Sequence, residues 1–399
     1  GVPPVSEFDL PLSWATLIDG TGAPRREADV AGREGRSSEV GKLPASQARR
    51  VIDARGLIVA PGLIDVHNHS DGWLLVEDHL VSKTAQGFTT EVLMSDGISY
   101  APVSAATAPH WLHYLRSLNG LRLGHYRGWR TIGEYMAQLD RKTVHSSVAP
   151  IPYANVRVLA CGWARRPPDD QEMRLIQHEI RRGMEDGAAG LSTGLDYIAQ
   201  CHATTDELVE ACTAMREYGG IYVTHIRYKK GLLPALREAV EIGRRAGVGV
   251  HISHLKSETA ETTDALLEYI DREATQQVDF TFDVYPYLPG STMLNSLLPY
   301  DAWDDGPLGV VPRLTCPELR RRFAETLVDY RTPLDEIRIA WVGSQAGKWV
   351  QGMSLADYIN AVGRSPADAL ADLLIDEHLA VLCVFYRGDD RMVARMLRH

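Results

Sequence analysis

Four histidines at regular positions are the residues best suited to chemistry in this sequence of 399 residues. His67 and His69 are two residues apart at the end of an apolar run, and His225 and His254 each end a later run. Side chains two apart on a strand point to the same side, so His67 and His69 can chelate one divalent metal ion. A lone H-x-H pattern is more often a pair of polar loop residues. Four histidines at the ends of three runs instead favour a metal site.

Asp96 ends a further apolar run and is followed by Gly97. In isolation, this position is typical of a turn aspartate. Beside four histidines, its carboxylate can bridge two cations or hydrogen-bond a ligand histidine. Imidazole and carboxylate donors without a thiolate suit zinc, and also manganese, cobalt or iron. We therefore expect one or two metal ions, whereas His251, three residues before His254, is expected to pack against a helix.

Short apolar runs alternate with amphipathic stretches from residue 58 onward, and this rhythm must position the histidines. The runs cover residues 58–69, 89–97, 146–152, 188–195, 220–227, 247–256 and 279–287. Amphipathic stretches at 172–187, 205–220 and 232–247 each end in glycine, a common helix stop. Seven such units predict an α/β fold, a (β/α)8 TIM-type barrel, in which chemistry lies at the carboxyl ends of the strands. The absence of a G-x-G-x-x-G motif after the first run disfavours a doubly wound sheet.

The predicted domains are a small, partial β-rich domain at 1–58 and a hydrolase barrel at 59–399, with an insertion around 288–378. No structure is predicted for the segment 31–43. The eighth strand is the open question, because only the runs at 337–343 and 379–386 remain as candidates. Either one of them closes the barrel or the closing strand is absent.

Composition excludes several classes of protein. Lys and Arg number 42 against 52 Asp and Glu, so a nucleic-acid partner is not expected. No run of about 18 apolar residues occurs, so no membrane span is expected. Five cysteines without a C-x-x-C pair indicate a reducing compartment, and we expect a cytoplasmic protein. The sequence does not indicate an oligomeric state.

The first apolar run, APGLIDVHNH at 60–69, resembles the first-strand signature of the amidohydrolase superfamily. Longer motifs resemble the D-aminoacylase group, the N-acyl-D-amino-acid deacylases: GLSTGLDY at 190–197, VTHIR at 223–227, VHISHLK at 250–256, and DVYPY at 283–287 with GST at 290–292. The resemblance implies hydrolysis of the linear amide bond of an N-acyl amino acid, with the D isomer as the expected substrate, by metal-bound hydroxide. The implied partner is therefore a small molecule.

Carried over by position, the resemblance implies that His67 and His69 bind one metal ion and that His225 and His254 bind the other. Asp96 lies between them, where the best-known members of the group have a cysteine ligand. The substrate-holding residues implied by the resemblance are Tyr197, Lys256, Tyr285 and Ser291.

The catalytic base of the group is an Asp on the eighth strand, after a helix that resembles 389–399. The chain ends at His399, where that stretch should begin. We expect that the C-terminal part is missing from the given chain. The fallback is that 379–386 closes the barrel and places Asp389 or Asp390 at the rim, and the third interpretation is a catalytically impaired, metal-binding barrel. Hydantoinase-like and dipeptidase-like hydrolysis are alternatives, although the fourth run lacks the lysine usual in cyclic-amide hydrolases.

Overall fold

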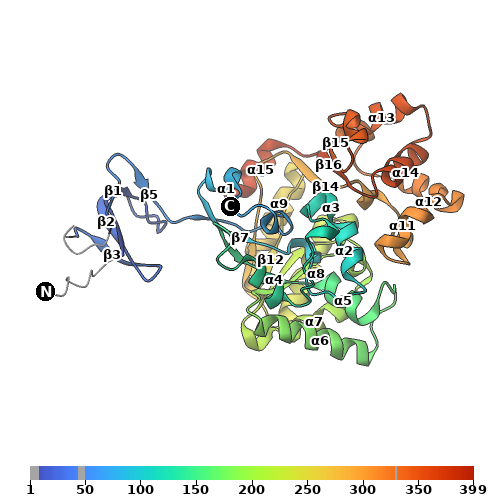
Figure 1. Cartoon of the computed structure of the whole chain (residues 1–399). Coiled ribbons are helices and arrows are strands. Elements are labelled where there is room, and N and C mark those ends of the chain that lie inside the picture. Colours follow the sequence, from blue (N-terminus) through green and yellow to red (C-terminus); the bar gives the residue numbers. More distant parts are fainter. Residues whose placement is uncertain (1–8, 44–49, 329) are drawn as a thin grey trace. The chain divides into compact units, whose positions relative to one another are not determined.

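The computed structural model describes residues 9–43, 50–328 and 330–399. Its contacts divide the chain into two compact units, both drawn in Figure 1. The first comprises the residues up to Leu63 together with Gly87–Thr89. The second comprises Ile64–Gln86 and Thr90–His399.

The first unit is built around a five-stranded sheet of order β3-β2-β1-β4, in which β5 also pairs with β1. The strands are β1 (Leu10–Leu17), β2 (Arg26–Arg33), β3 (Arg36–Gly41), β4 (Ile52–Asp53) and β5 (Ile58–Val59). The segment 31–43, which the sequence left unassigned, contributes the end of β2 and all of β3. Glu34 and Gly35 turn the chain between them with φ angles of 51° and 75°. A two-residue hairpin turn requires this left-handed backbone at both positions, and glycine adopts it without strain.

The second unit places short strands between helices in chain order. Its strands are β6 (Leu63–Asp65) and β7 (Phe88–Val92), whose first residues are grouped with the first unit, and β8 (Ser146–Val148), β9 (Ile151–Pro152), β10 (Gly190–Gly194), β11 (Ile221–His225), β12 (Val250–Ile252) and β13 (Phe280–Phe282). They form two sheets, β6-β7-β8 and β9-β10-β11-β12-β13, and the second sheet is parallel throughout. Each predicted apolar run contains at least one strand. Pairing among the described residues gives two sheets rather than one closed ring.

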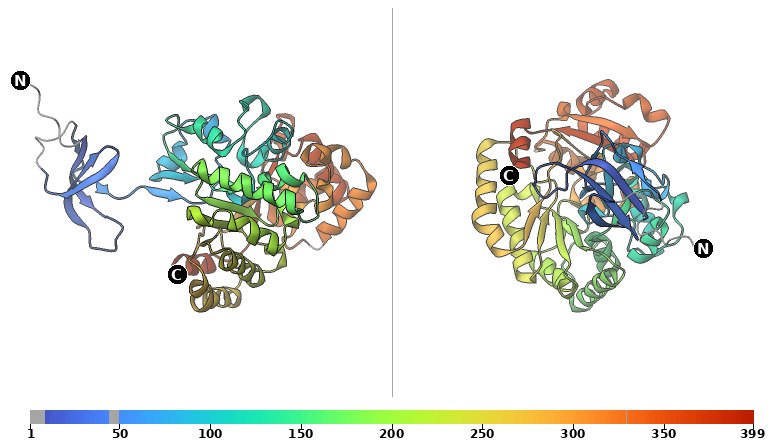
Figure 2. Two further views of the ribbon diagram at one scale, coloured as in Figure 1. Left: turned by 90° about the horizontal axis from the view of Figure 1, so that it is seen from below. Right: turned by 90° about the vertical axis from the view of Figure 1, so that its left-hand side faces the viewer.

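Helices cover the outside of these strands. The longer ones are α4 (Ile132–Leu139), α5 (Tyr153–Cys161), α6 (Asp170–Glu185), α7 (Thr205–Thr213), α8 (Leu232–Ala246) and α9 (Ala260–Tyr269). The shorter ones are α1 (Val81–Thr84), α2 (Ala108–Tyr114), α3 (Arg116–Asn119) and α10 (Thr275–Gln277). The three predicted amphipathic stretches coincide with α6, α7 and α8, and Figure 2 shows α6 to α9 as an arc around the strands. No helix in the described ranges is long and apolar enough to cross a membrane.

Sequence beyond residue 288 builds a separate sheet. Its strands β14 (Pro289–Met293), β15 (Ile337–Val342) and β16 (Val381–Tyr386) pair antiparallel in the order β14-β16-β15. The helices near it are α11 (Pro307–Arg313), α12 (Pro317–Val328), α13 (Leu355–Val362) and α14 (Pro366–Asp376), whereas α15 (Asp390–Leu397) follows β16 and packs against α9. The expectation that 337–343 or 379–386 closes the barrel is wrong for the described part of the chain, because β15 and β16 pair with each other and with β14, and neither pairs with β6 or β13.

Candidate metal centre

His67 and His69 lie in the loop directly after β6 and approach the same carboxylate. The Nε2 atom of His67 is 3.7 Å from Asp96 Oδ1, and the Nε2 atom of His69 is 3.4 Å from Asp96 Oδ2. Both side chains are mostly buried. The loop, rather than the strand itself, therefore turns the two imidazoles toward one point.

Asp96 lies in a single 3-10 turn, Ser95–Gly97, that follows β7, and it is 2% exposed. Its φ angle of 59° and the value of 56° at Met94 are left-handed, a costly conformation for residues other than glycine. Neighbouring side chains hold this backbone in place. Ser192 donates to the Met94 carbonyl over 2.6 Å, and the Gln200 amide donates to the Asp96 carbonyl over 2.9 Å. The carboxylate is thus fixed before anything binds to it.

The close approach of β10 to this turn depends on Gly194. A Cβ atom at that position would lie 2.3 Å from the Asp96 carbonyl oxygen, a contact that real structures do not tolerate. Gly194, in the GLSTGL motif, therefore lets β10 pack against the turn that carries the Asp96 carboxylate.

The other two histidines complete the group. His225 ends β11 and His254 follows β12, and the Nδ1 atom of the first lies 3.1 Å from Nε2 of the second. His254 Nε2 is also 3.4 Å from Asp96 Oδ1. One donor atom each from His67, Asp96 and His254 lie within 4.8 Å of one another, a spacing that suits a single ion. The structure thus brings together all five residues that the sequence suggested as ligands.

The donor set fits a divalent metal ion. Asp96 Oδ1 is buried, has no hydrogen-bond partner among the described residues, and faces the Nε2 atoms of His67 and His254. Unpartnered buried polar atoms are costly, and a bound ion would relieve part of that cost. Burial lowers the pKa of His67 to about 3, so its imidazole is neutral and has a lone pair to offer. Burial alone would raise the pKa of Asp96, but the imidazoles of His67, His254 and His69 around its carboxylate hold this pKa well below its usual range.

Asp283, which follows β13, was missed by sequence reasoning. Its Oδ1 atom accepts the backbone N–H of His254 over 2.7 Å, and its Oδ2 atom lies 2.9 Å from His251 Nε2. The Nδ1 atom of His251 lies 2.8 Å from the Thr281 hydroxyl. The prediction that His251 packs against a helix is wrong, because its ring lies against the neighbouring strand β13. Asp283 lies in the middle of the seventh run, directly after the strand-like Phe-Thr-Phe, so the end of that run in the sequence did not point to it.

Asp196 supports His225 in a similar way. It lies two residues beyond β10, and its Oδ2 atom is 3.3 Å from His225 Nε2. An outer carboxylate of this kind fixes the orientation and the tautomer of a ligand imidazole. Asp196 comes directly after the fourth apolar run, and an acidic residue at such a position was the sequence signal that could have identified it.

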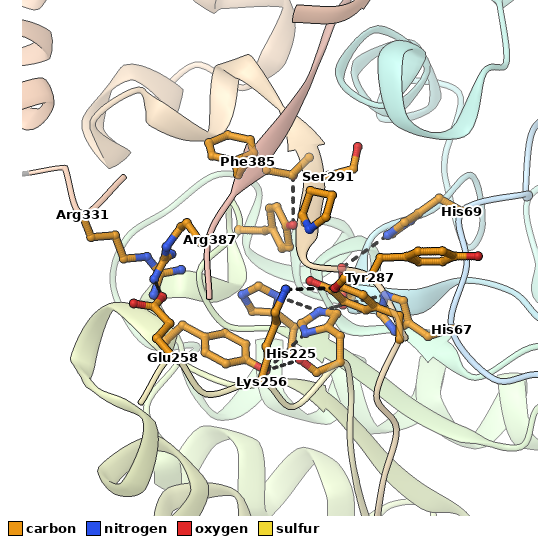
Figure 3. A pocket seen from close by; sticks show the side chains of 18 of the residues that line it. His67, His69, His225, Lys256, Glu258, Tyr287, Ser291, Arg331, Phe385 and Arg387 are labelled. Carbon is orange, nitrogen blue, oxygen red and sulfur yellow. Dashed lines mark hydrogen bonds and ion pairs between the residues drawn. The ribbon is translucent and has the colours of Figure 1, made fainter. Parts of the chain in front are cut away.

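A cavity of about 420 Å³ opens beside the five candidate ligands and is lined by all four predicted substrate-holding residues (Figure 3). The Tyr197 hydroxyl lies 3.1 Å from Thr292 Oγ1, and Ser291 donates to the Cys383 carbonyl over 3.1 Å. Lys256 lies 5.0 Å from the centre of the Tyr285 ring and donates to the carbonyls of residues 287 and 288.

Asp389, the fallback for the catalytic base, does not line this cavity. It caps the start of α15, where its side chain accepts the N–H of Arg391 over 2.8 Å and forms an ion pair with the same residue. The fallback is wrong because the strand before it, β16, belongs to the antiparallel sheet. Asp96 and Glu258 are the acidic residues that line the cavity within the described ranges.

Comparison with known proteins places this arrangement in a family. The D-aminoacylase of Alcaligenes xylosoxydans xylosoxydans is 36% identical over 296 residues, which are 72% of this chain and 59% of the relative. A crystal structure of D-aminoacylase, described as defining a subset of the amidohydrolases, superposes with a TM-score of 0.76 at 30% identity and covers 98% of this chain and 74% of its own. The chain belongs to the D-aminoacylase group of the amidohydrolases.

A second solved structure, the N-acyl-D-glutamate deacylase of Bordetella bronchiseptica, contains zinc and a phosphonate that mimics the tetrahedral intermediate. It superposes with a TM-score of 0.78 at 30% sequence identity and covers 98% of this chain and 74% of its own. No family model matches the chain. Within the D-aminoacylase group, this chain spans less than two thirds of the length of the curated relative.

Proposed function

We propose that the protein is a metal-dependent deacylase that hydrolyses the linear amide bond of N-acyl-D-amino acids. The carrying observation is the convergence of four histidines and one carboxylate at one end of a cavity: three of the histidines lie 3.4–3.7 Å from Asp96, and the fourth, His225, lies 3.1 Å from His254. The names of the relatives, D-aminoacylase and N-acyl-D-glutamate deacylase, support the substrate class.

The proposed ligands are His67, His69, Asp96, His225 and His254, holding one or two ions. Zinc is the proposed metal, supported by the zinc in the Bordetella neighbour, and the donor set also suits manganese, cobalt or iron. Such an ion, when bound, supplies a Lewis acid for the amide carbonyl and lowers the pKa of water toward neutrality.

The chain's own side chains orient the ligands and the substrate. The Tyr228 hydroxyl donates to the backbone carbonyls of Ser253 and His254 and lies 3.2 Å from His254 Nδ1, which restricts the rotation of that ring. Lys256 and Tyr285 lie side by side on the cavity wall, where an ammonium and a phenol together can bind a carboxylate. The side chains of Tyr197 and Tyr285 also line the cavity and reduce its volume, so less water has to leave when a substrate binds.

We also propose that the two sheets β6–β8 and β9–β13 belong to a (β/α)8 barrel, that the small β-rich domain ends near residue 58, and that the protein acts on a small molecule in the cytoplasm. The order of the strands supports the first proposal, and the cysteine usage supports the last.

Turnover of N-acetyl-D-methionine by the full-length protein with added zinc tests the proposed function. We expect release of free D-methionine that stops when zinc is chelated and returns when zinc is restored. No release with zinc bound would refute the deacylase, and equal rates for the L isomer would refute only the stereochemical part.

A further inference from the structure

The wall of the cavity away from His67 and His69 carries three cationic side chains, Lys256, Arg331 and Arg387, which we call the outer cation group. In the view of Figure 3, the two arginines lie with Glu258 on one side of the pocket and the two histidines lie on the other. Arg387 directly follows β16, and Arg331 follows α12. The antiparallel sheet and its helices, rather than the parallel strands, therefore supply both arginines.

This group has more positive than negative charge. Glu258 forms an ion pair with Arg387 and is the acidic residue of the cavity wall outside the metal centre. The ammonium of Lys256 is bonded to neutral backbone carbonyls. Arg331 forms no ion pair with the acidic residues that the structure describes. One carboxylate thus faces three cations.

Desolvation makes this excess unfavourable at Arg387, whereas Arg331 is exposed. The side chain of Arg387 is only 21% exposed, and burial lowers its pKa. Partly buried cations are stabilised by anions with which they share hydrogen bonds, so the empty space beside them suits carboxylates.

We propose that Arg387 and Arg331 form a binding subsite for a second carboxylate of the substrate, so that the preferred substrates are dianionic N-acyl-D-amino acids. This inference rests on the proposed function, in which Lys256 binds the first carboxylate. A guanidinium presents two parallel N–H donors to a carboxylate, a geometry that the ammonium of Lys256 does not offer. The second carboxylate belongs either to an acidic amino-acid side chain or to a dicarboxylic acyl group.

Binding to the zinc-free chain tests the subsite without turnover. Titration calorimetry compares N-acetyl-D-leucine, which has one carboxylate, with N-acetyl-D-glutamate and N-succinyl-D-leucine, which have two. We expect one or both of the dianionic ligands to bind at least about tenfold more tightly, as one charge-assisted hydrogen-bonded pair implies. Preference for the first identifies the side chain as the source of the carboxylate, and preference for the second identifies the acyl group. Equal Kd values for all three would overturn the proposal.

Variants locate the effect. Arg387→Met should abolish the preference and weaken N-acetyl-D-leucine far less than the dianionic ligands, whose second carboxylate loses its partner. Arg391→Met, which removes the same charge from an exposed residue four positions away, should preserve the preference. If Arg387→Met weakens all three ligands equally, Arg387 binds the first carboxylate and the proposal is wrong.

Glu258→Gln provides a variant that should strengthen binding. Glu258 is half exposed, so its replacement by an amide should not impair folding, and it releases Arg387 from its partner. The dianionic ligands should then bind more tightly, and unchanged or weaker binding would contradict the subsite. Failure of the subsite and failure of the deacylase remain distinguishable. Tighter binding of the dianionic ligands without turnover would contradict only the proposed function. Turnover without tighter binding of these ligands would contradict only the proposed subsite.

Discussion

The two ends of the cavity differ in how the chain builds them. At the inner end, the side chains of the five candidate ligands are between 2% and 19% exposed and follow the carboxyl ends of strands β6, β7, β11 and β12. At the outer end, Arg331 and Arg387 come from the connections of an antiparallel sheet, and Glu258 is half exposed. The inner end is fixed by packing, whereas the ion pair between Arg387 and Glu258 holds the outer end at the surface. We infer that residues at the ends of the parallel strands carry out the reaction, whereas residues supplied by the antiparallel sheet β14-β16-β15 select the substrate.

The largest effect is expected from Asp96→Ala. This substitution removes the carboxylate that contacts three histidines, so zinc affinity should fall by more than about 100-fold. Loss of a residue that only hydrogen-bonds a metal ligand costs about 10- to 100-fold. Elemental analysis after dialysis against a defined free-zinc buffer measures this. Asp389→Ala is the matched control, since Asp389 caps α15 outside the cavity and its loss should leave the zinc content unchanged. Unchanged zinc in Asp96→Ala would mean that Asp96 is not a ligand.

A smaller effect is expected from Asp283→Leu. His254 has a left-handed backbone with φ of 39°, and the Asp283 carboxylate holds its N–H over 2.7 Å. Loss of this acceptor should weaken zinc binding by about 10- to 100-fold, as for other outer partners of ligand histidines. Asp283→Asn retains an oxygen acceptor and should lose far less. Equal losses in the two variants would show that charge, rather than the hydrogen bond, is what matters.

Much of the inner end was predictable from the sequence. A polar residue at the end of an apolar run marks the carboxyl end of a strand, and this pattern can be recognised without knowing the neighbouring elements. Asp96 and His225 were found in this way, and the same rule would have added Asp196, whereas Asp283 lies inside its run because β13 ends earlier than the apolar pattern does. The outer end was not predictable. Its residues meet through the pairing of β14 with β16, strands about 90 residues apart in the chain, and nothing local in LAVLCVFY distinguishes an antiparallel strand from a closing barrel strand.

Ile339→Val tests whether the later sheet is independent of the metal centre. Ile339 is fully buried on β15, and loss of one methylene there should lower the free energy of unfolding by about 1 kcal/mol. Zinc affinity should be unchanged, because β15 contributes no residue to the cavity wall. Denaturant unfolding and zinc titration of the same sample measure the two quantities. A parallel fall in zinc affinity would show that the two ends are coupled.

Tyr197→Phe should give the smallest effect, at the junction of the two ends. The Tyr197 hydroxyl contacts Thr292 on β14, while its ring lies 5.0 Å from that of His225. Removal of the hydroxyl alone should change the KM for N-acetyl-D-methionine only a few-fold, the equivalent of one neutral hydrogen bond, and leave zinc content intact. A loss of zinc in this variant would instead assign the hydroxyl to the metal centre.

The most direct test of the central claim is anomalous diffraction at the zinc absorption edge from crystals of the chain grown with zinc. The account predicts an anomalous peak within coordination distance of His67, Asp96 and His254, about 2.0–2.2 Å from their donor atoms. It predicts loss of this peak in Asp96→Ala crystals. A well-ordered His67–Asp96–His254 cluster without a peak, or zinc bound only elsewhere, would contradict it.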